Sequence, residues 1–451
     1  MDSVAVTAAI AQAVRGITYE ALPADVRTIA RHCLLDWFGV ALAGGEEPLT
    51  RMLRAEVLDE GGAPQSTLLG HGARVSARQA ALVNGAASHA LDYDDVHQGM
   101  SGHPSVPVIP ALLALAERRR SSGRDVMAAL VAGIETECRI GAYVMPGHYT
   151  TGFHATGTLG TFGAAAACAH LMDLDEGQWL HALGIAGAQA AGLKVMFGTM
   201  CKPLHAGKAA ANGLLAATLA ARGFTSSEAV LEASQGFAAT QTATPNADRA
   251  LDGLGAGFAI RDVLFKYHAA CYGTHETIEA LTRLRERHGL APDDVARISL
   301  VVPPGNLAMC NIQEPRTALE GKFSLRFTAA LALAGGGTQE AAFTDGAVAR
   351  PDLVAIRDRV SVAGSATASD GTEVTIVTCS GAELREKVNL NIPMTDLDAQ
   401  WSRLTAKFRS LAAPVVGPRA PEDLVELVAR FDEVEDVSAI VELASARALT
   451  R

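Results

Sequence analysis

The most informative stretch of the chain for fold and function is His89-Ala-Leu-Asp-Tyr-Asp-Asp-Val-His-Gln-Gly-Met-Ser-Gly-His-Pro-Ser105. It places three carboxylates and three imidazoles within fifteen residues, between segments rich in Ala, Gly and Leu. Titratable groups are costly to bury unless they are paired. Active sites use such burial to shift pKa values toward neutrality. The stretch therefore predicts an active-site loop within a helical protein.

The apolar segments around this loop predict the fold. As far as about residue 265 they have helical length, and several are apolar nearly all round, which is typical of helices inside a bundle. Near residue 295 the pattern changes to β-branched, alternating runs such as Val295–Val302 and Glu383–Val388, with helices between them. After about residue 395 it is helical again. We predict a mainly α protein with a smaller α/β (α+β) insert. The expected early helices are Ala24–Ala43, Ala77–Ala90, Val106–Arg120, Val126–Tyr143, Gly157–Leu171, Glu176–Ala191 and Lys208–Arg222.

Composition excludes several classes of protein. With 49% hydrophobic and 19% charged residues among 451, the chain can bury a large core. A net charge of −11 argues against nucleic-acid binding, which needs a basic surface. Seven scattered cysteines without a CxxC pair argue against disulfides and structural zinc. No apolar run reaches the roughly 20 residues of a membrane span, and no signal peptide is visible. We expect a cytoplasmic protein with no nucleic-acid or membrane partner.

The acidic loop allows three interpretations. Asp92, Asp94 and Asp95 with His97 and His103 could bind a divalent metal, because Asp and His are common ligands. They could instead transfer protons and contact a substrate. Alternatively, they form a solvated loop whose Asp residues cap the helix after Pro104, where the helix N-terminus favours an anion.

Two further motifs combine basic and small residues. In Gly147–Gly160, two His residues and Tyr149 precede a Gly-rich helix start, whose backbone N–H groups can approach a carboxylate. The alternative is simple helix packing. In Phe197–Gly213, Lys202 lies just before Pro203 in a predicted turn, where it is either a desolvated catalytic or anion-binding lysine or a lysine that extends to the surface. The motif lacks the GxxxxGK[ST] spacing of a P-loop, so we do not expect it to bind a nucleotide.

A fourth motif, Lys266–His275, lies at the expected boundary between the helical and α/β parts. Clefts between domains often hold small-molecule sites. The alternative is a linker with exposed polar residues. Cys271 alone is more often a small buried hydrophobe than a nucleophile.

Together these motifs resemble the MmgE/PrpD family, which contains 2-methylcitrate dehydratase, cis-aconitate decarboxylase and iminodisuccinate epimerase. They occur in the family's order over about residues 84–275. The matching pieces are His89-Ala-Leu-Asp92-Tyr-Asp94-Asp95, Gly102-His103-Pro104-Ser105, Gly152-Phe153-His154-x-Thr156, Gly198-Thr199-Met200-x-Lys202-Pro203-Leu204-His205-x-Gly207 and Lys266-x-x-x-x-Cys271-Tyr272.

The resemblance implies an architecture and a site. It implies an all-helical domain of residues 1–266 plus 391–451, an α/β lid of residues 267–390, a homodimer, and catalysis without metal or organic cofactor. The catalytic positions that it implies are Asp92, His103, Tyr149, His154 and Lys202. The resemblance adds Lys266 as a further basic position, and we predict Lys266, Cys271, Tyr272 and His205 as substrate-binding residues.

Two departures separate the chain from the decarboxylase pattern. That pattern has His where this chain has Cys271, and Tyr where it has Phe327. Cys271-Tyr272 and Tyr149 are nearer to the epimerase-like branch. Decarboxylation of cis-aconitate is therefore the less favoured activity.

We therefore predict a cofactor-independent enzyme that abstracts a proton α to a carboxylate of a small anionic di- or tricarboxylate. A lyase resembling 2-methylcitrate dehydratase ranks first. An epimerase of an iminodisuccinate-like substrate and a cis-aconitate decarboxylase are alternatives. A carboxylate-binding protein without activity and a metal-dependent hydrolase are alternatives from other classes.

Overall fold

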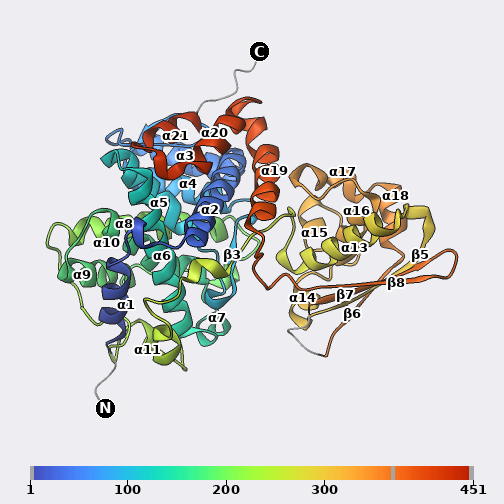
Figure 1. Cartoon of the computed structure of the whole chain (residues 1–451), viewed down its shortest axis with the longest axis horizontal. Coiled ribbons are helices and arrows are strands. Elements are labelled where there is room, and N and C mark those ends of the chain that lie inside the picture. The colour runs from blue at the N-terminus through green and yellow to red at the C-terminus, as the bar shows by residue number, and fades with distance from the viewer. Residues whose placement is uncertain (1–4, 367–370, 446–451) are drawn as a thin grey trace. The chain divides into compact units, whose positions relative to one another are not determined.

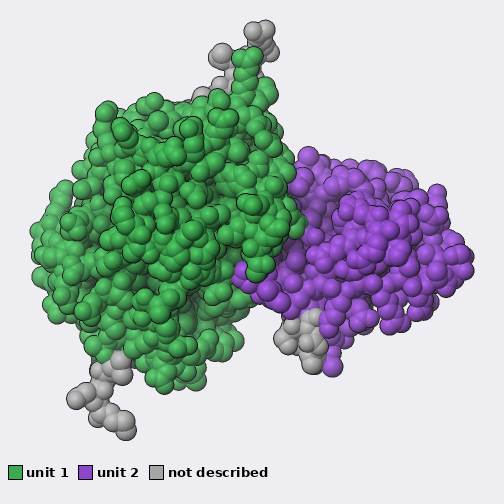
Figure 2. Space-filling model, in the orientation of Figure 1, with its two compact units in different colours: residues 1–265, 394–451 green, residues 266–393 purple. Residues whose placement is uncertain are grey.

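The fold comes from a computed structural model that describes residues 5–366 and 371–445. It separates into two compact units, one of residues 1–265 with 394–451 and one of residues 266–393 (Figures 1 and 2). Because 61% of the described residues are helical and the sheets are small, the predicted class, mainly α with a smaller α/β part, is confirmed.

The first unit is a bundle of helices contributed by both ends of the chain (Figure 1). None of the described helices combines the length and the apolar character that crossing a lipid bilayer requires. The helices of the first unit are α1 Val6–Arg15, α2 Ala24–Ala43, α3 Pro48–Glu60, α4 Ala77–His89, α5 Ser105–Arg119, α6 Gly123–Val144, α7 Gly147–Thr151, α8 Ala155–Leu171, α9 Glu176–Gly187, α10 Cys201–Ala220, α11 Phe237–Gln241, α12 Ala247–Leu251, α19 Leu397–Val416, α20 Ala420–Ala429 and α21 Ser438–Leu443. Short strand pairs join β1 Ser66–Thr67 to β2 Arg74–Val75, and β3 Val96–His97 to β4 Val263–Leu264.

Helix α8 lies at the centre of this bundle. Every residue of α8 except His170 is buried, and α6 and α10 pack against it. Small residues make the close packing possible. A Cβ on Gly207 of α10 would lie 2.2 Å from the Leu82 carbonyl of α4, so only glycine lets these helices meet. This contact brings the N-terminal turn of α10 toward the end of α4, where the acidic loop begins.

The second unit is a four-stranded sheet packed against helices. The strand order is β6-β5-β7-β8, with β5 parallel to β6 and antiparallel to β7. Helix α13 contacts β7 and β8, and α16 contacts β6, which explains why strand β7 buries alternate residues. The elements are α13 His275–His288, β5 Val295–Val302, α14 Pro304–Met309, α15 Ala318–Lys322, α16 Leu325–Ala334, α17 Asp345–Val348, α18 Pro351–Arg357, β6 Val360–Gly364, β7 Thr372–Thr378 and β8 Glu383–Val388.

Candidate functional site

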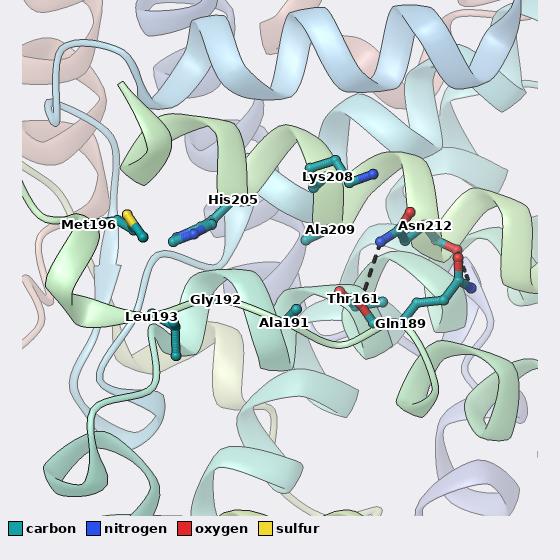
Figure 3. Close-up of a pocket in the computed structure, with 10 residues that line it drawn as sticks. All are labelled: Thr161, Gln189, Ala191, Gly192, Leu193, Met196, His205, Lys208, Ala209 and Asn212. Carbon is teal, nitrogen blue, oxygen red and sulfur yellow. Dashed lines mark hydrogen bonds between the residues drawn. The ribbon is translucent and has the colours of Figure 1, made fainter. Parts of the chain in front are cut away.

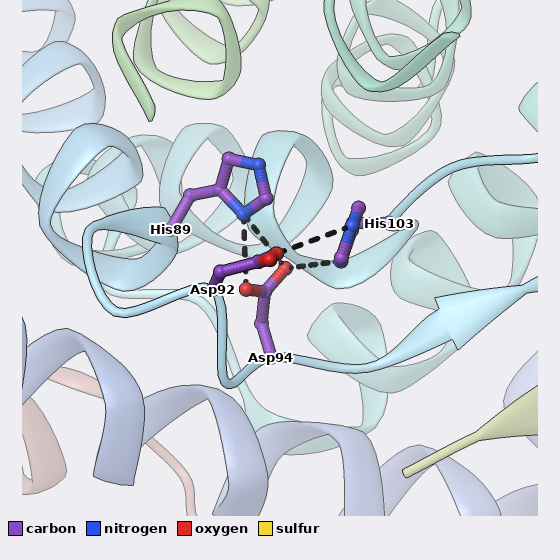
Figure 4. Close-up of side chains that lie close together, drawn as sticks. All are labelled: His89, Asp92, Asp94 and His103. Atoms are coloured by element: carbon purple, nitrogen blue, oxygen red, sulfur yellow. Dashed lines mark hydrogen bonds and ion pairs between the residues drawn. The ribbon is translucent and has the colours of Figure 1, made fainter. Parts of the chain in front are cut away.

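A buried carboxylate joins two imidazoles at the end of α4. His89 is the last residue of α4, and its Nδ1 lies 2.9 Å from Oδ1 of Asp94. The Nδ1 atom of His103 lies 2.8 Å from Oδ2 of the same carboxylate (Figure 4). Asp92 completes the group, with its Oδ1 3.6 Å from His103 Nε2. The loop thus folds back, so that His89 at its start and His103 at its end contact the same Asp94 carboxylate.

The charges in this group follow from burial and pairing. Burial alone would raise the pKa of Asp94, but the adjacent imidazoles of His103 and His89 hold it well below its usual range. Burial also lowers the pKa of His89 to about 4, against the opposing effect of Asp94. Asp94 is therefore an ionised acid inside the protein, and it orients the imidazole rings of His89 and His103.

Lys202 supplies positive charge from α10. Its Nζ donates to Oδ1 of Asp92 at 2.7 Å, and its side chain is 14% exposed. The prediction that Lys202 lies in a turn is wrong, because α10 already begins at Cys201. Proline is tolerated in the first helical turn, where its missing N–H has no intrahelical acceptor, so Pro203 does not delay the helix. The helix start instead fixes Lys202 beside the acidic loop.

Two more imidazoles complete the cluster. His154 precedes α8, and its Nδ1 lies 3.0 Å from Nδ1 of His205 on α10, so one ring donates and the other accepts. The His154 ring stacks on His89 at 5.9 Å between centroids. Burial is the main cause that lowers the pKa of both His154 and His205; for His154, the charges of His89 and Lys202 lower it further. His154 is therefore a neutral imidazole, able to accept a proton, beside a lysine ammonium.

The structure brings five of the predicted residues together in the first unit: Asp92, His103, His154, Lys202 and His205. Tyr149 lies on α7, where the Lys194 ammonium sits 3.6 Å from its ring centroid.

The other three predicted residues belong to the second unit and are described within it. Lys266 is 2% exposed there, and Cys271 is buried with its Sγ 3.3 Å from Met309 Sδ. The Tyr272 hydroxyl donates to the Leu390 carbonyl at 2.6 Å.

Sequence reasoning missed the central acid. The resemblance gave neither Asp94 nor His89 a role in the site, and capping the helix after Pro104 was one interpretation of Asp94. Asp95 has that capping role instead, because its carboxylate accepts the Ser105 N–H at the start of α5. A signal was present, since His89, Asp92 and Asp94 all lie within the matching piece His89-Ala-Leu-Asp92-Tyr-Asp94-Asp95.

The same group contains potential metal ligands. His89, Asp92, Asp94 and His103 each offer one ligand atom within 4.8 Å of the others. However, the Lys202 ammonium already binds Asp92, and a cation placed among these atoms would meet its positive charge. The donor set therefore fits an ion cluster that already contains a lysine ammonium better than a divalent metal. The absence of a metal cofactor stays a prediction.

A cavity of about 310 Å³ is lined in part by His205, one of the two paired imidazoles (Figure 3). Thr161 of α8 and the segment 189–196 form part of its lining, and His205, Lys208 and Asn212 of α10 line another part. Because His205 also contacts His154, the cavity reaches the cluster on the His205 side. Its size suits a small organic molecule.

Comparisons with known proteins agree with this arrangement of motifs. The MmgE/PrpD N-terminal domain model matches residues 8–250, and the MmgE/PrpD C-terminal domain model matches residues 268–433. Similar proteins include cis-aconitate decarboxylase of Homo sapiens, 27% identical over 97% of this chain and 94% of that protein. Cis-aconitate decarboxylase of Aspergillus terreus is 25% identical over 97% of this chain and 95% of that protein. With models of both domains covering most of its length, the chain belongs to the MmgE/PrpD family.

Proposed function

We propose that this protein is a lyase acting on a small di- or tricarboxylate, with Asp92, His103, His154 and Lys202 as its catalytic residues. One observation carries the proposal. A neutral His154 imidazole lies in the same cluster as the Lys202 ammonium and an imidazole, His103, paired with a buried carboxylate. A proton acceptor and groups that bind anions are thereby combined.

The cluster suits proton transfer at a carbon next to a carboxylate. Such a proton is weakly acidic, so the charge that develops when it leaves needs positive groups nearby. In this proposal Lys202 binds the substrate carboxylate and stabilises that charge. His154 accepts the proton, which its neutral state allows. Asp94 holds His103 in one orientation, so that His103 can return a proton or bind the leaving group.

The relatives support the class of substrate more than the individual reaction. The similar proteins named above are cis-aconitate decarboxylases, and cis-aconitate is a tricarboxylate. Elimination of water and loss of carbon dioxide both involve proton transfer at carbon. Cys271 and Phe327 depart from the decarboxylase pattern, so dehydration of a 2-methylcitrate-like substrate ranks first here. Decarboxylation now ranks second, because the similar proteins are named for that reaction, and epimerisation, which shares the first step, ranks third.

The test is incubation with 2-methylcitrate, citrate, cis-aconitate and iminodisuccinate in deuterated water, followed by proton NMR. Without carbon dioxide release, dehydration of 2-methylcitrate is identified by collapse of its methyl doublet to a singlet or by a new vinyl signal, and dehydration of citrate by a new vinyl signal. With carbon dioxide release, decarboxylation of cis-aconitate is identified by replacement of its vinyl signal by the two signals of a methylene alkene. Deuterium uptake on an unchanged skeleton identifies an epimerase. Wild-type protein that changes none of these substrates would contradict the proposal.

The site assignment has its own test. Lys202→Ala should lose turnover by roughly 100-fold or more, because a charge that stabilises the transition state is removed. Arg222→Ala, an exposed charge just beyond the same helix, is the matched control and should behave as wild type. Undiminished turnover in Lys202→Ala would refute the site while leaving the reaction class untouched.

We also propose that the protein is a homodimer. Four large apolar side chains lie exposed within the short segment 193–200, namely Leu193, Val195, Phe197 and Met200, with Val195 77% exposed. Contiguous exposed apolar side chains are typical of association surfaces. Phe197 also contacts the His154 ring edge-on, so a partner here would cover the site. Light scattering should give twice the chain mass for wild type, and Val195→Glu should shift it toward the monomer.

A further inference from the structure

A buried lysine from the C-terminal part of the chain holds the acidic loop. Lys407 lies on α19 and is 2% exposed. Its Nζ lies 2.6 Å from Oδ1 of Asp36 on α2, and it donates to the Tyr93 carbonyl, also at 2.6 Å. Tyr93 is the residue between Asp92 and Asp94. We infer that Lys407 is a positioning residue of the candidate site, which fixes through the Tyr93 carbonyl the backbone that carries Asp92 and Asp94.

This backbone needs to be fixed. Asp92 has a φ of 51°, in the left-handed region, which is unfavourable for an L-residue, although Asp tolerates it better than most. Such conformations persist only when their surroundings determine them. Here each of three consecutive residues has its own anchor. Lys202 binds the Asp92 side chain, Lys407 binds the Tyr93 carbonyl, and two imidazoles bind the Asp94 carboxylate.

The Lys407 ammonium also contacts the Tyr93 ring, in addition to the Tyr93 carbonyl and Asp36. Tyr93 is completely buried, and its ring centroid lies 4.0 Å from Lys407 Nζ, so the ammonium contacts the residue through both carbonyl and ring. Asp36 is 3% exposed and balances the lysine's charge. The arrangement is therefore an ion pair between α2 and α19 that uses a second donor N–H to hold the loop.

Folding and positioning can be separated in an experiment. Removing one partner of a buried ion pair leaves an uncompensated charge, whereas removing both is often neutral. Asp36→Asn combined with Lys407→Met removes both charges together with the donor to Tyr93. We expect its unfolding, followed by tryptophan fluorescence, to stay close to that of wild type. We expect kcat on the substrate found by NMR to fall on the order of 100-fold, the size of loss that a displacement of about 1 Å can cause.

Two variants serve as references. Lys407→Arg keeps a charged donor; its crystal structure should show N–H groups bound to Asp36 and Tyr93, with kcat near that of wild type. Arg409→Met removes an exposed charge two residues away on α19 and should change nothing. Crystal structures of wild type and the double variant should differ at residues 92–94, with the Asp92 φ leaving the left-handed region.

The inference rests on the proposed function only for its effect on kcat. A folded double variant with an unmoved backbone at residues 92–94, or with wild-type kcat, would overturn it. If the double variant does not fold, Lys407→Arg provides the test. A fully active Lys407→Arg protein whose guanidinium points away from the Tyr93 carbonyl would also overturn the inference. Wild-type protein inactive on every carboxylate would instead refute the proposed function, while the crystal structures would still decide the positioning role.

Discussion

An unpartnered buried carboxyl in α6 gives a stability prediction with a defined pH dependence. Glu137 is completely buried, and neither of its carboxyl oxygens has a hydrogen-bond partner among the described residues. Its Oε2 points at α8, where it lies 2.7 Å from the place that a Cβ on Gly163 would occupy. Burial, reinforced by the charge of Asp95, raises the pKa of Glu137 well above 4.5, its ordinary value. The folded protein therefore holds this side chain as a neutral acid.

The size of the effect follows from linkage. Because the folded pKa lies above the unfolded one, the contribution of Glu137 to stability is complete below pH 4.5. It then decreases by about 1.4 kcal/mol per pH unit until the folded pKa is reached. Glu137→Gln is nearly isosteric and does not titrate. Relative to wild type, this variant should therefore gain stability as the pH rises from 5.5, by about 1.4 kcal/mol per pH unit for as long as the pH stays below the folded pKa of Glu137. Any fixed cost of burying the amide cancels in that comparison.

The assay is urea unfolding of both proteins at pH 5.5, 6.5 and 7.5. Tryptophan fluorescence is the appropriate signal, because Trp37, Trp179 and Trp401 all lie in the first unit with Glu137. Glu135→Gln is the matched control on the same helix. Glu135 accepts hydrogen bonds from Arg139 Nε and from the Ala259 N–H, both at 2.6 Å, so its substitution should lower stability. Parallel pH curves for wild type and Glu137→Gln would refute the reasoning.

Three further predictions concern the site. Asp94→Asn should destabilise the protein by about 3–5 kcal/mol at pH 7, since it removes the shared partner of the buried His89 imidazole and the half-buried His103 imidazole. Because the folded pKa of Asp94 is depressed, this loss should shrink as the pH falls below 3.8, as measured by urea unfolding. His154→Gln should keep the circular dichroism spectrum of wild type and lose about 100-fold or more in turnover, because the proton acceptor is gone. Dialysis against EDTA should leave turnover unchanged, and a loss restored by one divalent metal would replace this mechanism with a metal-assisted one.

Local sequence patterns predicted most of the elements. Helix α2 and strands β5 and β8 have the bounds that periodicity indicated, because each is a continuous patterned run between turn residues. Helix α10 begins earlier than expected, since a proline inside the first turn was taken for a boundary.

The site was predictable only in part. Motifs identified Asp92, His103, His154 and Lys202 as a set, but not the arrangement of their charges. The roles of Asp94 and His89 depend on how the loop folds back, which no local pattern encodes. Lys407 lies more than 300 residues from Tyr93 in the sequence, and only the packing of α19 on α2 brings them together. The homodimer, the cytoplasmic location and the roles of Lys266, Cys271 and Tyr272 stay predictions.

The division of the first unit between the two chain ends affects how the protein is made. When the ribosome has finished residues 1–265, α2 still lacks α19, and Asp36 lacks its lysine. The whole second unit is synthesised before residue 407 appears. Closing a loop of this length is slow, and partly built domains expose apolar surface during synthesis. The acidic loop therefore acquires its last anchor, Lys407, near the end of translation. Until α19 has been synthesised, the first unit depends on chaperones to cover its exposed apolar surface, and truncations that remove α19 should abolish folding.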